Sequence, residues 1–182
     1  MQSEDGGGGP MNENRAREDL EEELLEDEEE DAQKDKYLTF RIVNEDYAIE
    51  IAHVTEIVTA QKITEVPDMP EYLKGVINLR GQVVPVVDVR TRFRLPPRPY
   101  DERTCFVVVR LQDLNVGLAV DTVCEVLIIP AAQVSPPPKL SKGPGSRYVK
   151  GLGKSGDTVK ILLDVGKLLL DAEMEQISAL QA

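Results

Sequence analysis

The chain has few of the side chains that bind metals or carry catalysis. Among its 182 residues there is one histidine, His53, and there are two cysteines, Cys105 and Cys124, with no CxxC spacing. A structural zinc site takes about four such ligands, so we expect no metal, and we expect no other cofactor. Both cysteines lie in apolar runs, which predicts two buried thiols in a reducing cytoplasm.

The sequence also lacks common catalytic motifs. It has no GxSxG or HExxH motif, and GLGK at 151–154 has neither the spacing nor the Ser/Thr of a phosphate-binding loop. His53 lies between Glu50 and Glu56, which would suit a general base, but a single histidine is more often a surface or core residue. These features argue against an enzyme. The alternative to a non-catalytic protein is a small β-barrel that binds a ligand or acts as an enzyme.

The composition also argues against a protein that binds nucleic acid or spans a membrane. Aromatic residues make up 4% of the chain, and no stretch approaches the ~20 apolar residues of a membrane-spanning helix. Six arginines lie within 80–103, yet residues 37–182 carry 17 basic and 18 acidic side chains. A nearly neutral body with few aromatic stacking platforms argues against nucleic-acid binding. The leader lacks the apolar run of a signal peptide, and we expect no direct membrane insertion.

Negative charge is concentrated at the start of the chain. Residues 1–36 hold 15 of the 33 acidic residues and 4 basic ones. Blocks of like charge repel and bury little apolar surface, so this stretch is predicted to be a disordered acidic leader. Leu20, Leu24 and Leu25 could line one face of a short, frayed helix. The leader is interpreted as a solvated tail, with contact to a basic partner as the alternative.

The remainder has the pattern of β-structure. From Tyr37 onward, short apolar runs with a period of two alternate with turn residues, which is typical of half-buried strands. Hairpins are predicted at 37–51, 76–89 and 105–120, and further strands at 63–67 and 159–165. Helical spacing of apolar residues predicts a C-terminal helical tail at 171–182.

Part of this body occurs twice. At an offset of 69 positions, residues 40–58 align with 109–127 without a gap, and at an offset of 76 residues 72–89 align with 148–165. A unit of about 60 residues buries only a marginal core. The repeat therefore predicts two lobes that share one core, with each small sheet closed into a barrel.

Matched positions help to separate what the fold needs from what function needs. The matched pairs include Gly75 with Gly151, Asp88 with Asp164, and Glu56 with Glu125. We expect the glycines to permit a turn and the aspartates to cap one. Arg80 is matched by Gly156, so the fold alone does not require this cation. We predict that Arg80 pairs with Glu56, with a solvated turn arginine as the alternative.

Four stretches, in conserved order and spacing, resemble a known family. They are VTEIVTAQKITEVP (54–67), PEYLKGVINLRGQVVPVVDVRTRF (70–93), VGLAVDTVCEVL (116–127) and SRYVKGLGKSGDTVKILLDVGKLL (146–169). Over residues 37–170 the chain resembles the CheW family, the coupling proteins of bacterial chemotaxis. The resemblance implies a mainly β fold of two pseudo-repeated, five-stranded SH3-like barrels that share a core, with lobes at 37–100 and 101–165.

The resemblance also implies a function, that of a non-catalytic, cytoplasmic signalling adaptor. Such proteins couple chemoreceptors to a histidine kinase by binding the receptor signalling tip and the kinase regulatory domain. The corresponding receptor-binding positions are Val54, Gly75, Arg80, Val123 and Val126. The kinase-binding positions are Glu56, Ile57, Ile63 and Val66 in one contact, and Ser135 and Leu140 in a second. For each valine, a place in the barrel core is the alternative, and at the last two positions relatives can carry a charged and an aromatic residue instead.

Overall fold

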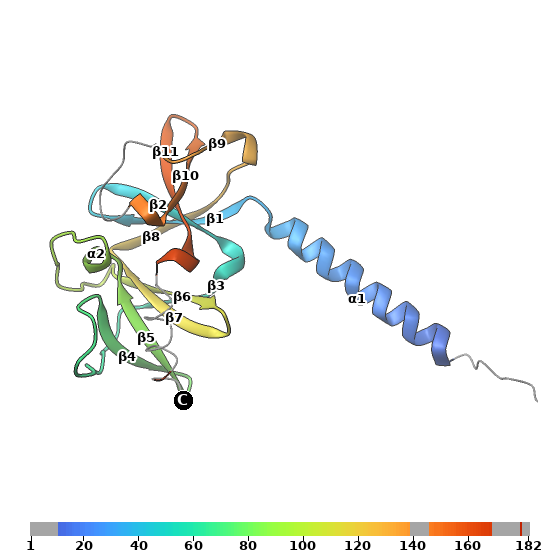
Figure 1. The fold of residues 1–182 in the computed structure, drawn as a ribbon, viewed down its shortest axis with the longest axis horizontal. Helices are drawn as coiled ribbons and strands as arrows, with labels where there is room; N and C mark the ends of the chain where they lie inside the picture. Colours follow the sequence, from blue (N-terminus) through green and yellow to red (C-terminus); the bar gives the residue numbers. More distant parts are fainter. Residues whose placement is uncertain (1–10, 139–145, 169–178, 180–182) are drawn as a thin grey trace, which may run out of the picture. The chain divides into compact units, whose positions relative to one another are not determined.

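The computed structural model describes residues 11–138, 146–168 and 179 (Figure 1). It divides into two compact units, Met1–Lys34 and Asp35–Ala182. The predicted helical tail at 171–182 lies outside the described residues apart from position 179.

Within the first unit, residues 11–33 are helical, whereas the sequence predicted disorder for them. α1 (Met11–Gln33) runs for 23 residues. Glutamate, leucine, alanine and arginine are strong helix formers. Glu13 and Arg17, like Arg15 and Asp19, are opposite charges four positions apart, which stabilise a helix. Local propensity therefore outweighs the carboxylate repulsion on which the prediction of disorder depended.

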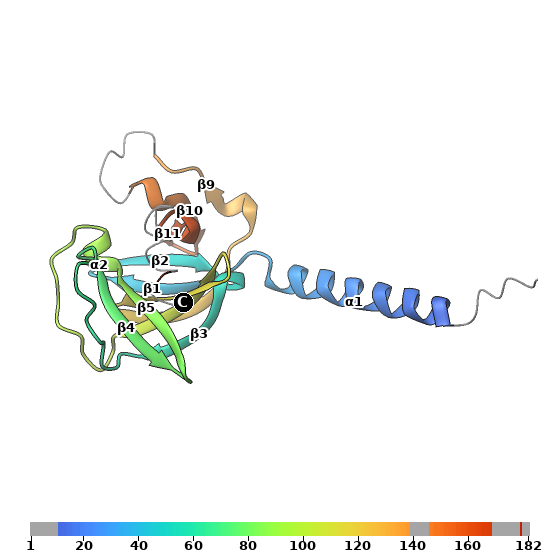
Figure 2. The same ribbon diagram turned by 60° about the horizontal axis from the view of Figure 1, so that its bottom comes forward.

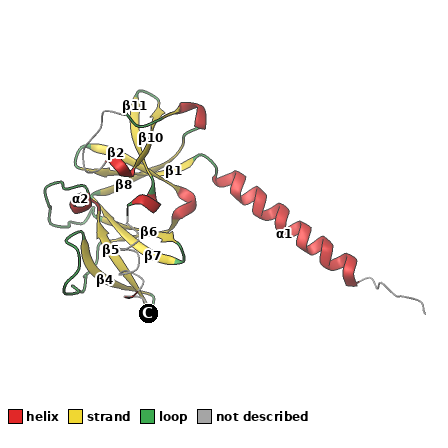
Figure 3. Ribbon diagram, viewed as in Figure 1, coloured by secondary structure: helices red, strands yellow, loops and turns green. Residues whose placement is uncertain are grey.

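The second unit is built mostly of strands (Figure 3). The strands are β1 (Lys36–Ile42), β2 (Glu45–Glu50), β3 (Val54–Thr59), β4 (Leu73–Leu79), β5 (Gln82–Asp88), β6 (Cys105–Leu111), β7 (Leu114–Val120), β8 (Thr122–Ile128), β9 (Val134–Ser135), β10 (Val149–Ser155) and β11 (Thr158–Leu163). The short helical segments are α2 (Val89–Arg92), η1 (Ile51–His53), η2 (Ala131–Gln133), η3 (Ser146–Tyr148) and η4 (Val165–Lys167). The mainly β fold class is therefore confirmed.

These strands form two sheets. Sheet A has six strands in the order β8-β1-β2-β11-β10-β9, and sheet B has five in the order β3-β6-β7-β5-β4. The prediction of five strands in each half fails for sheet A, because the two-residue strand β9 adds a sixth. The chain passes from sheet A to sheet B between β2 and β3, and from sheet B to sheet A between β7 and β8. The strand that follows each passage, β3 or β8, lies at an edge of its sheet.

The two copies of the repeat exchange their first hairpins. Sheet A takes β1 and β2 from the first copy and β8 to β11 from the second, while sheet B takes β6 and β7 from the second copy and β3 to β5 from the first. Figure 1 shows the result, with β1 and β2 beside β10 and β11 although the chain separates them widely. The predicted lobes, 37–100 and 101–165, therefore do not coincide with the sheets. The repeat identifies the two copies but not which strands pair across them.

The sheets repeat the same strand order and register. In sheet B, β5 runs parallel to β7 and Val86 lies opposite Gly117. In sheet A, β11 runs parallel to β2 and Leu162 lies opposite Ala48. These two pairs occupy matched positions of the repeat, so the internal duplication predicted from the sequence is confirmed.

Local strand pairing largely agrees with the sequence pattern. The predicted hairpins are confirmed as β1–β2, β4–β5 and β6–β7, all antiparallel, and the strand at 159–165 corresponds to β11. Residues 63–67 do not form the predicted strand. They lie beside β4, to which Thr64 is joined by an isolated bridge with Val76. Strands β3, β8, β9 and β10 were not predicted.

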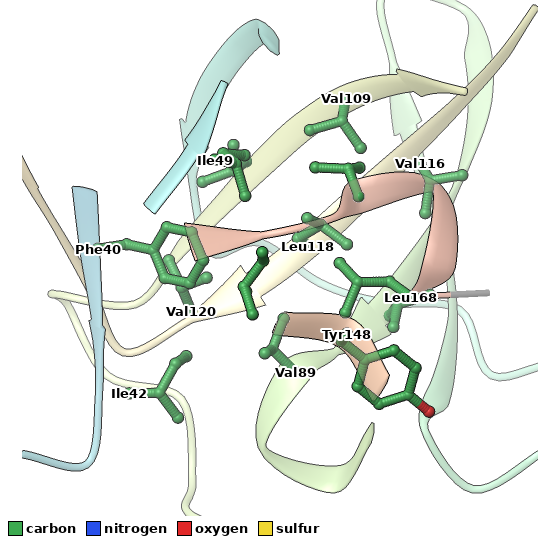
Figure 4. Close-up of a cluster of buried hydrophobic side chains, with 14 of the residues drawn as sticks. Phe40, Ile42, Ile49, Val89, Val109, Val116, Leu118, Val120, Tyr148 and Leu168 are labelled. Atoms are coloured by element: carbon green, nitrogen blue, oxygen red, sulfur yellow. The ribbon is translucent and has the colours of Figure 1, made fainter. Parts of the chain in front are cut away.

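One hydrophobic core lies between the two sheets. It includes Phe40 from sheet A and Val109 and Leu118 from sheet B (Figure 4). Each sheet also packs a smaller cluster of its own, around Phe106 in sheet B and around Leu162 in sheet A. Burial of these apolar side chains is the main favourable contribution to folding. The shared core that the repeat predicted is present.

Two matched aspartates begin the short helical segments that follow β5 and β11. Asp88 accepts a hydrogen bond from the backbone N–H of Thr91 at 2.9 Å. Asp164 accepts one from the backbone N–H of Lys167 at 3.3 Å. Each carboxylate thus accepts a hydrogen bond from a backbone N–H in the first turn of the segment that follows it, as an N-cap residue does. The prediction that the twin aspartates cap the same turn twice is confirmed.

A mostly buried ion pair fixes the point where the chain crosses from β7 to β8. Asp121 accepts hydrogen bonds from Nε and Nη2 of Arg90 at 2.7 and 2.6 Å. It also accepts one from the backbone N–H of Val43 at 2.8 Å. Burial raises the pKa of Asp121, but these hydrogen bonds outweigh burial and hold the pKa below its ordinary value.

The free energy of unfolding should therefore fall in acid. A carboxyl group whose pKa is lowered in the folded state contributes stability above its unfolded pKa of about 4, and that stability is lost as the pH falls through the folded pKa. Asp121→Asn should flatten the acid side of this profile, measured as urea midpoints at decreasing pH. The matched control, Asp113→Asn at an exposed turn, should leave the acid slope unchanged. Equal slopes for wild type and Asp121→Asn would contradict this assignment.

Candidate functional site

The predicted receptor-binding valines lie on the two edge strands. Val54 on β3 and Val123 on β8 are half-buried and pack against the shared core. For these two the core interpretation applies at least in part. Val126, also on β8, is 51% exposed and is therefore available to a partner. The sequence matches Val54 to Val123, and the structure places both on equivalent edges of the two sheets.

Gly75 lies inside a strand rather than at the predicted turn. It is part of β4, where the register with β5 shifts, and its φ is +142°. The carbonyl oxygen of Thr64 lies where a side chain would begin, 2.1 Å from an ideal Cβ. At the matched Gly151, the carbonyl oxygen of Ser135 lies 2.9 Å from such a Cβ. Both glycines therefore permit the close approach of a crossing segment.

Arg80 occupies a turn position that favours glycine. The two-residue turn between β4 and β5 has φ of 52° at Arg80 and 83° at Gly81, as in a type I′ hairpin turn. The matched Gly156 has φ of 60°. A non-glycine residue in this conformation costs roughly 1–2 kcal/mol. The second copy therefore has the residue that the backbone prefers, and the first copy has a cation in spite of that cost.

The predicted pair between Arg80 and Glu56 is confirmed. Nη2 of Arg80 lies 2.9 Å from Oε2 of Glu56 on β3. The Arg80 side chain is 81% exposed and that of Glu56 is 25% exposed. The pair therefore joins the tip of the β4–β5 hairpin, drawn in green in Figure 2, to the edge strand β3.

A hollow lies beside this ion pair on sheet B. Its lining residues are Thr55, Glu56, Leu79, Arg80, Gln82, Val84, Val108 and Asn115. Leu79 and the buried Val84 and Val108 supply its apolar part, while side chains with hydrogen-bonding groups supply the rest. This set of residues is called the sheet B hollow below.

The predicted kinase-binding residues fall into two groups. Ile57 on β3 is 42% exposed and neighbours Glu56 in the sequence. Ile63 and Val66 are half-buried in the segment that crosses β4, and Cγ2 of Ile63 lies 2.8 Å from the ideal Cβ position of Gly75. The structure therefore brings Gly75, predicted to contact the receptor, next to a predicted kinase contact.

The second predicted kinase contact is only partly described. Ser135 is exposed on β9, where it crosses Gly151 much as Thr64 crosses Gly75. Leu140 lies outside the described residues. The two predicted kinase contacts thus include crossing segments at equivalent places in sheets B and A.

The structure forms the contact of His53 with Glu50, one of the two glutamates that flank it in the sequence. Nε2 of His53 lies 3.4 Å from Glu50, but Glu50 also accepts a hydrogen bond from Lys150, and Glu56 is paired with Arg80. Each glutamate therefore has a cationic partner of its own.

Other features correct or extend the sequence interpretation. Cys124 is exposed on β8 and Cys105 is only half-buried, so the prediction of two buried thiols is wrong. The letters GLGKSG at 151–156 also fit the pattern GxGxxG, but they lie in the β10–β11 hairpin rather than in a strand-to-helix turn. Lys160 and Asp46, which sequence reasoning missed, form an ion pair at 2.6 Å in sheet A. The only signal for it was the replacement of Val84 and Asn115 by charged residues at matched positions.

Comparison with known families identifies the fold. A family model described as the CheW-like domain matches residues 36–173. The chain belongs to the CheW-like domain family. The matched range begins at β1 and contains both sheets, while α1 precedes it.

Individual relatives agree with this assignment. The chain is 38% identical over 139 residues to Chemotaxis protein CheW of Klebsiella aerogenes, covering 76% of this chain and 84% of that protein. It is 36% identical over 135 residues to Chemotaxis protein CheW of Helicobacter pylori, covering 74% and 81%. The crystal structure of the scaffolding protein TtCheW from Thermoanaerobacter tengcongensis is similar to this CheW-like domain, with a TM-score of 0.71, 31% identity, and coverage of 76% of this chain and 94% of that one.

Membrane-spanning helices and metal-binding clusters are both absent from the described part of the chain. There, no helix combines the length and apolar character needed to cross a bilayer. Nor do three or more His, Cys, Asp or Glu side chains gather there in a way that could hold a metal ion.

Proposed function

We propose that this protein is a non-catalytic chemotaxis adaptor that couples chemoreceptors to a histidine kinase in the cytoplasm. The observation that carries the proposal is the CheW-like match, which spans both sheets. Relatives named as chemotaxis and scaffolding proteins support it. In this function the protein binds the receptor signalling tip and the kinase regulatory domain, and it carries out no reaction.

The fold suits two separate contacts. Each sheet packs its own small cluster in addition to the shared core, which supports the proposal that each is an SH3-like barrel. The receptor-binding residues are Val54, Gly75, Arg80, Val123 and Val126. The kinase-binding residues are Glu56, Ile57, Ile63 and Val66 in one contact, with Ser135 and Leu140 in a second.

Titration of the purified protein with each partner tests the function. A receptor signalling fragment and a kinase regulatory domain should each bind with a Kd of about 1 μM, or roughly -8 kcal/mol, in isothermal titration calorimetry. Saturation with one partner should leave a site for the other. If neither partner binds, the adaptor function is wrong.

Replacing Arg80 should weaken receptor binding without unfolding the protein. Arg80→Gly copies the second repeat, and relief of left-handed strain offsets an exposed ion pair worth ~0–1 kcal/mol. We expect a nearly unchanged thermal midpoint and a loss of receptor affinity of about fivefold, typical of an interface cation. The control is Arg110→Ala, which removes an exposed arginine paired with Asp113 at 3.1 Å. Unchanged receptor affinity in Arg80→Gly would leave Arg80 as a solvated turn residue.

A further inference from the structure

The sheet B hollow has a filled counterpart in sheet A. In the repeat, Val84 of β5 corresponds to Lys160 of β11, and Asn115 of β7 corresponds to Asp46 of β2. Because the two sheets share strand order and register, these residues occupy equivalent places. The protein therefore contains the same site twice, with different side chains in it.

In sheet A the site is occupied by the chain's own lysine. Nζ of Lys160 lies 2.6 Å from Oδ2 of Asp46, and the Lys160 side chain is 10% exposed. Nε of Arg41 donates to the other oxygen of Asp46 at 2.9 Å. Hydrogen bonds from Arg41 and Lys160 hold the pKa of Asp46 below its ordinary value. This site thus accepts an aliphatic stem that ends in a cation.

In sheet B the internal lysine is replaced by a shorter, apolar side chain. Val84 supplies part of the apolar lining of the hollow, and Asn115 supplies an amide where sheet A has a carboxylate. The carboxylate of this hollow comes from Glu56 instead. Arg80 contacts Oε2 of Glu56, and a carboxylate accepts several hydrogen bonds, so Glu56 has capacity for a second cation.

We propose that the sheet B hollow receives a lysine or arginine side chain of the kinase partner, whose charge pairs with Glu56. This inference rests on the proposed function, in which Glu56 belongs to the kinase contact. The aliphatic stem of the incoming residue lies against Val84 and Val108, as the stem of Lys160 fills the equivalent site. Arg80 is exposed and held by one ion pair, so it shifts at little cost when the partner's cation arrives.

A double substitution that copies sheet A tests the site directly. Val84→Lys with Asn115→Asp should fill the hollow from within, and kinase affinity should fall at least about tenfold, as when a buried contact is blocked. Receptor affinity should stay the same. The matched control, Lys160→Val with Asp46→Asn, alters the equivalent site of sheet A and should leave kinase affinity unchanged in protein that still melts cooperatively. Unchanged kinase affinity in a folded Val84→Lys/Asn115→Asp protein would overturn the proposal.

Surface variants keep the test decisive if the double substitution does not fold. Gln82 is exposed at the hollow, so Gln82→Lys should place a competing cation beside Glu56 and weaken kinase binding. Glu56→Gln should weaken it by roughly tenfold, as expected for an interfacial charge pair. Arg80→Gln should tighten kinase binding, because it removes the internal cation that competes for Glu56.

The opposite pattern identifies a different occupant. If Arg80→Gln weakens kinase binding and Glu56→Gln does not, the partner brings a carboxylate to Arg80, and the proposal is wrong. A contact between opposite charges should also weaken as salt is raised. Failure of the proposed function is a separate result, because in that case the wild-type protein does not bind the kinase regulatory domain at all.

Discussion

Residues 35–100, expressed alone, are expected to remain unfolded, and residues 101–182 likewise. The first fragment contains β1 to β5, but β3 pairs with β6 and β5 pairs with β7, both of which belong to the second half. The hairpin β1–β2 in turn pairs with β8 and β11. Each half would therefore expose the unpaired edges and the apolar faces that the other half covers.

The measurement is circular dichroism and amide NMR on each fragment and on their mixture. Alone, each should lack a cooperative thermal transition, and the mixture should regain one because the exchanged hairpins can pair again. Deletion of residues 1–34 is the matched control. It removes the separate unit that contains α1 and should shift the thermal midpoint by no more than a few degrees, equivalent to less than about 1 kcal/mol. A cooperatively folded, monomeric 35–100 fragment would contradict the exchange.

Local signals explain why the hairpins were predictable and the exchange was not. Period-two alternation and turn residues lie within 10 to 15 consecutive positions, so β1–β2, β4–β5 and β6–β7 follow from the sequence alone. The pairing of β3 with β6 or of β8 with β1 depends on which edges meet in space. Even β3, a strand of alternating burial, was not recognised, because its apolar residues fall at positions 54, 57 and 58 rather than at every second position.

In the candidate site, too, one feature could be predicted from the sequence and another required the spatial arrangement of the strands. The pair of Arg80 with Glu56 was predictable because the repeat conserves the glutamate position and loses the arginine. The sheet B hollow was not, since the exchange of Lys160 for Val84 becomes informative only when both are known to occupy equivalent strands. Disorder was mispredicted for residues 11–33 because their charge was weighed above their helix propensity.

Gly75→Ala is expected to destabilise the protein by about 3 kcal/mol or more, the range of severe packing and backbone defects. A Cβ atom there would lie 2.1 Å from the carbonyl oxygen of Thr64, and real Cβ contacts are never so short. The crossing segment must therefore move, and the backbone hydrogen bonds of Thr64 with Val76, at 2.8 and 2.9 Å, must weaken. The φ of +142° adds conformational strain for any residue with a side chain.

Three other glycines separate the steric cause from the conformational one. Gly81→Ala adds strain at φ of +83° in open space, and Gly151→Ala adds a 2.9 Å contact to Ser135 without a positive φ. Gly117→Ala adds only ordinary contacts, the nearest at 3.5 Å. Urea denaturation should give the largest loss for Gly75, intermediate losses for Gly151 and Gly81, and the smallest for Gly117. Because the crossing segment carries Ile63, a folded Gly75→Ala protein should also lose kinase affinity more than receptor affinity. A stability loss no larger than that of Gly117→Ala would show that the close approach of Thr64 to Gly75 does not constrain this position.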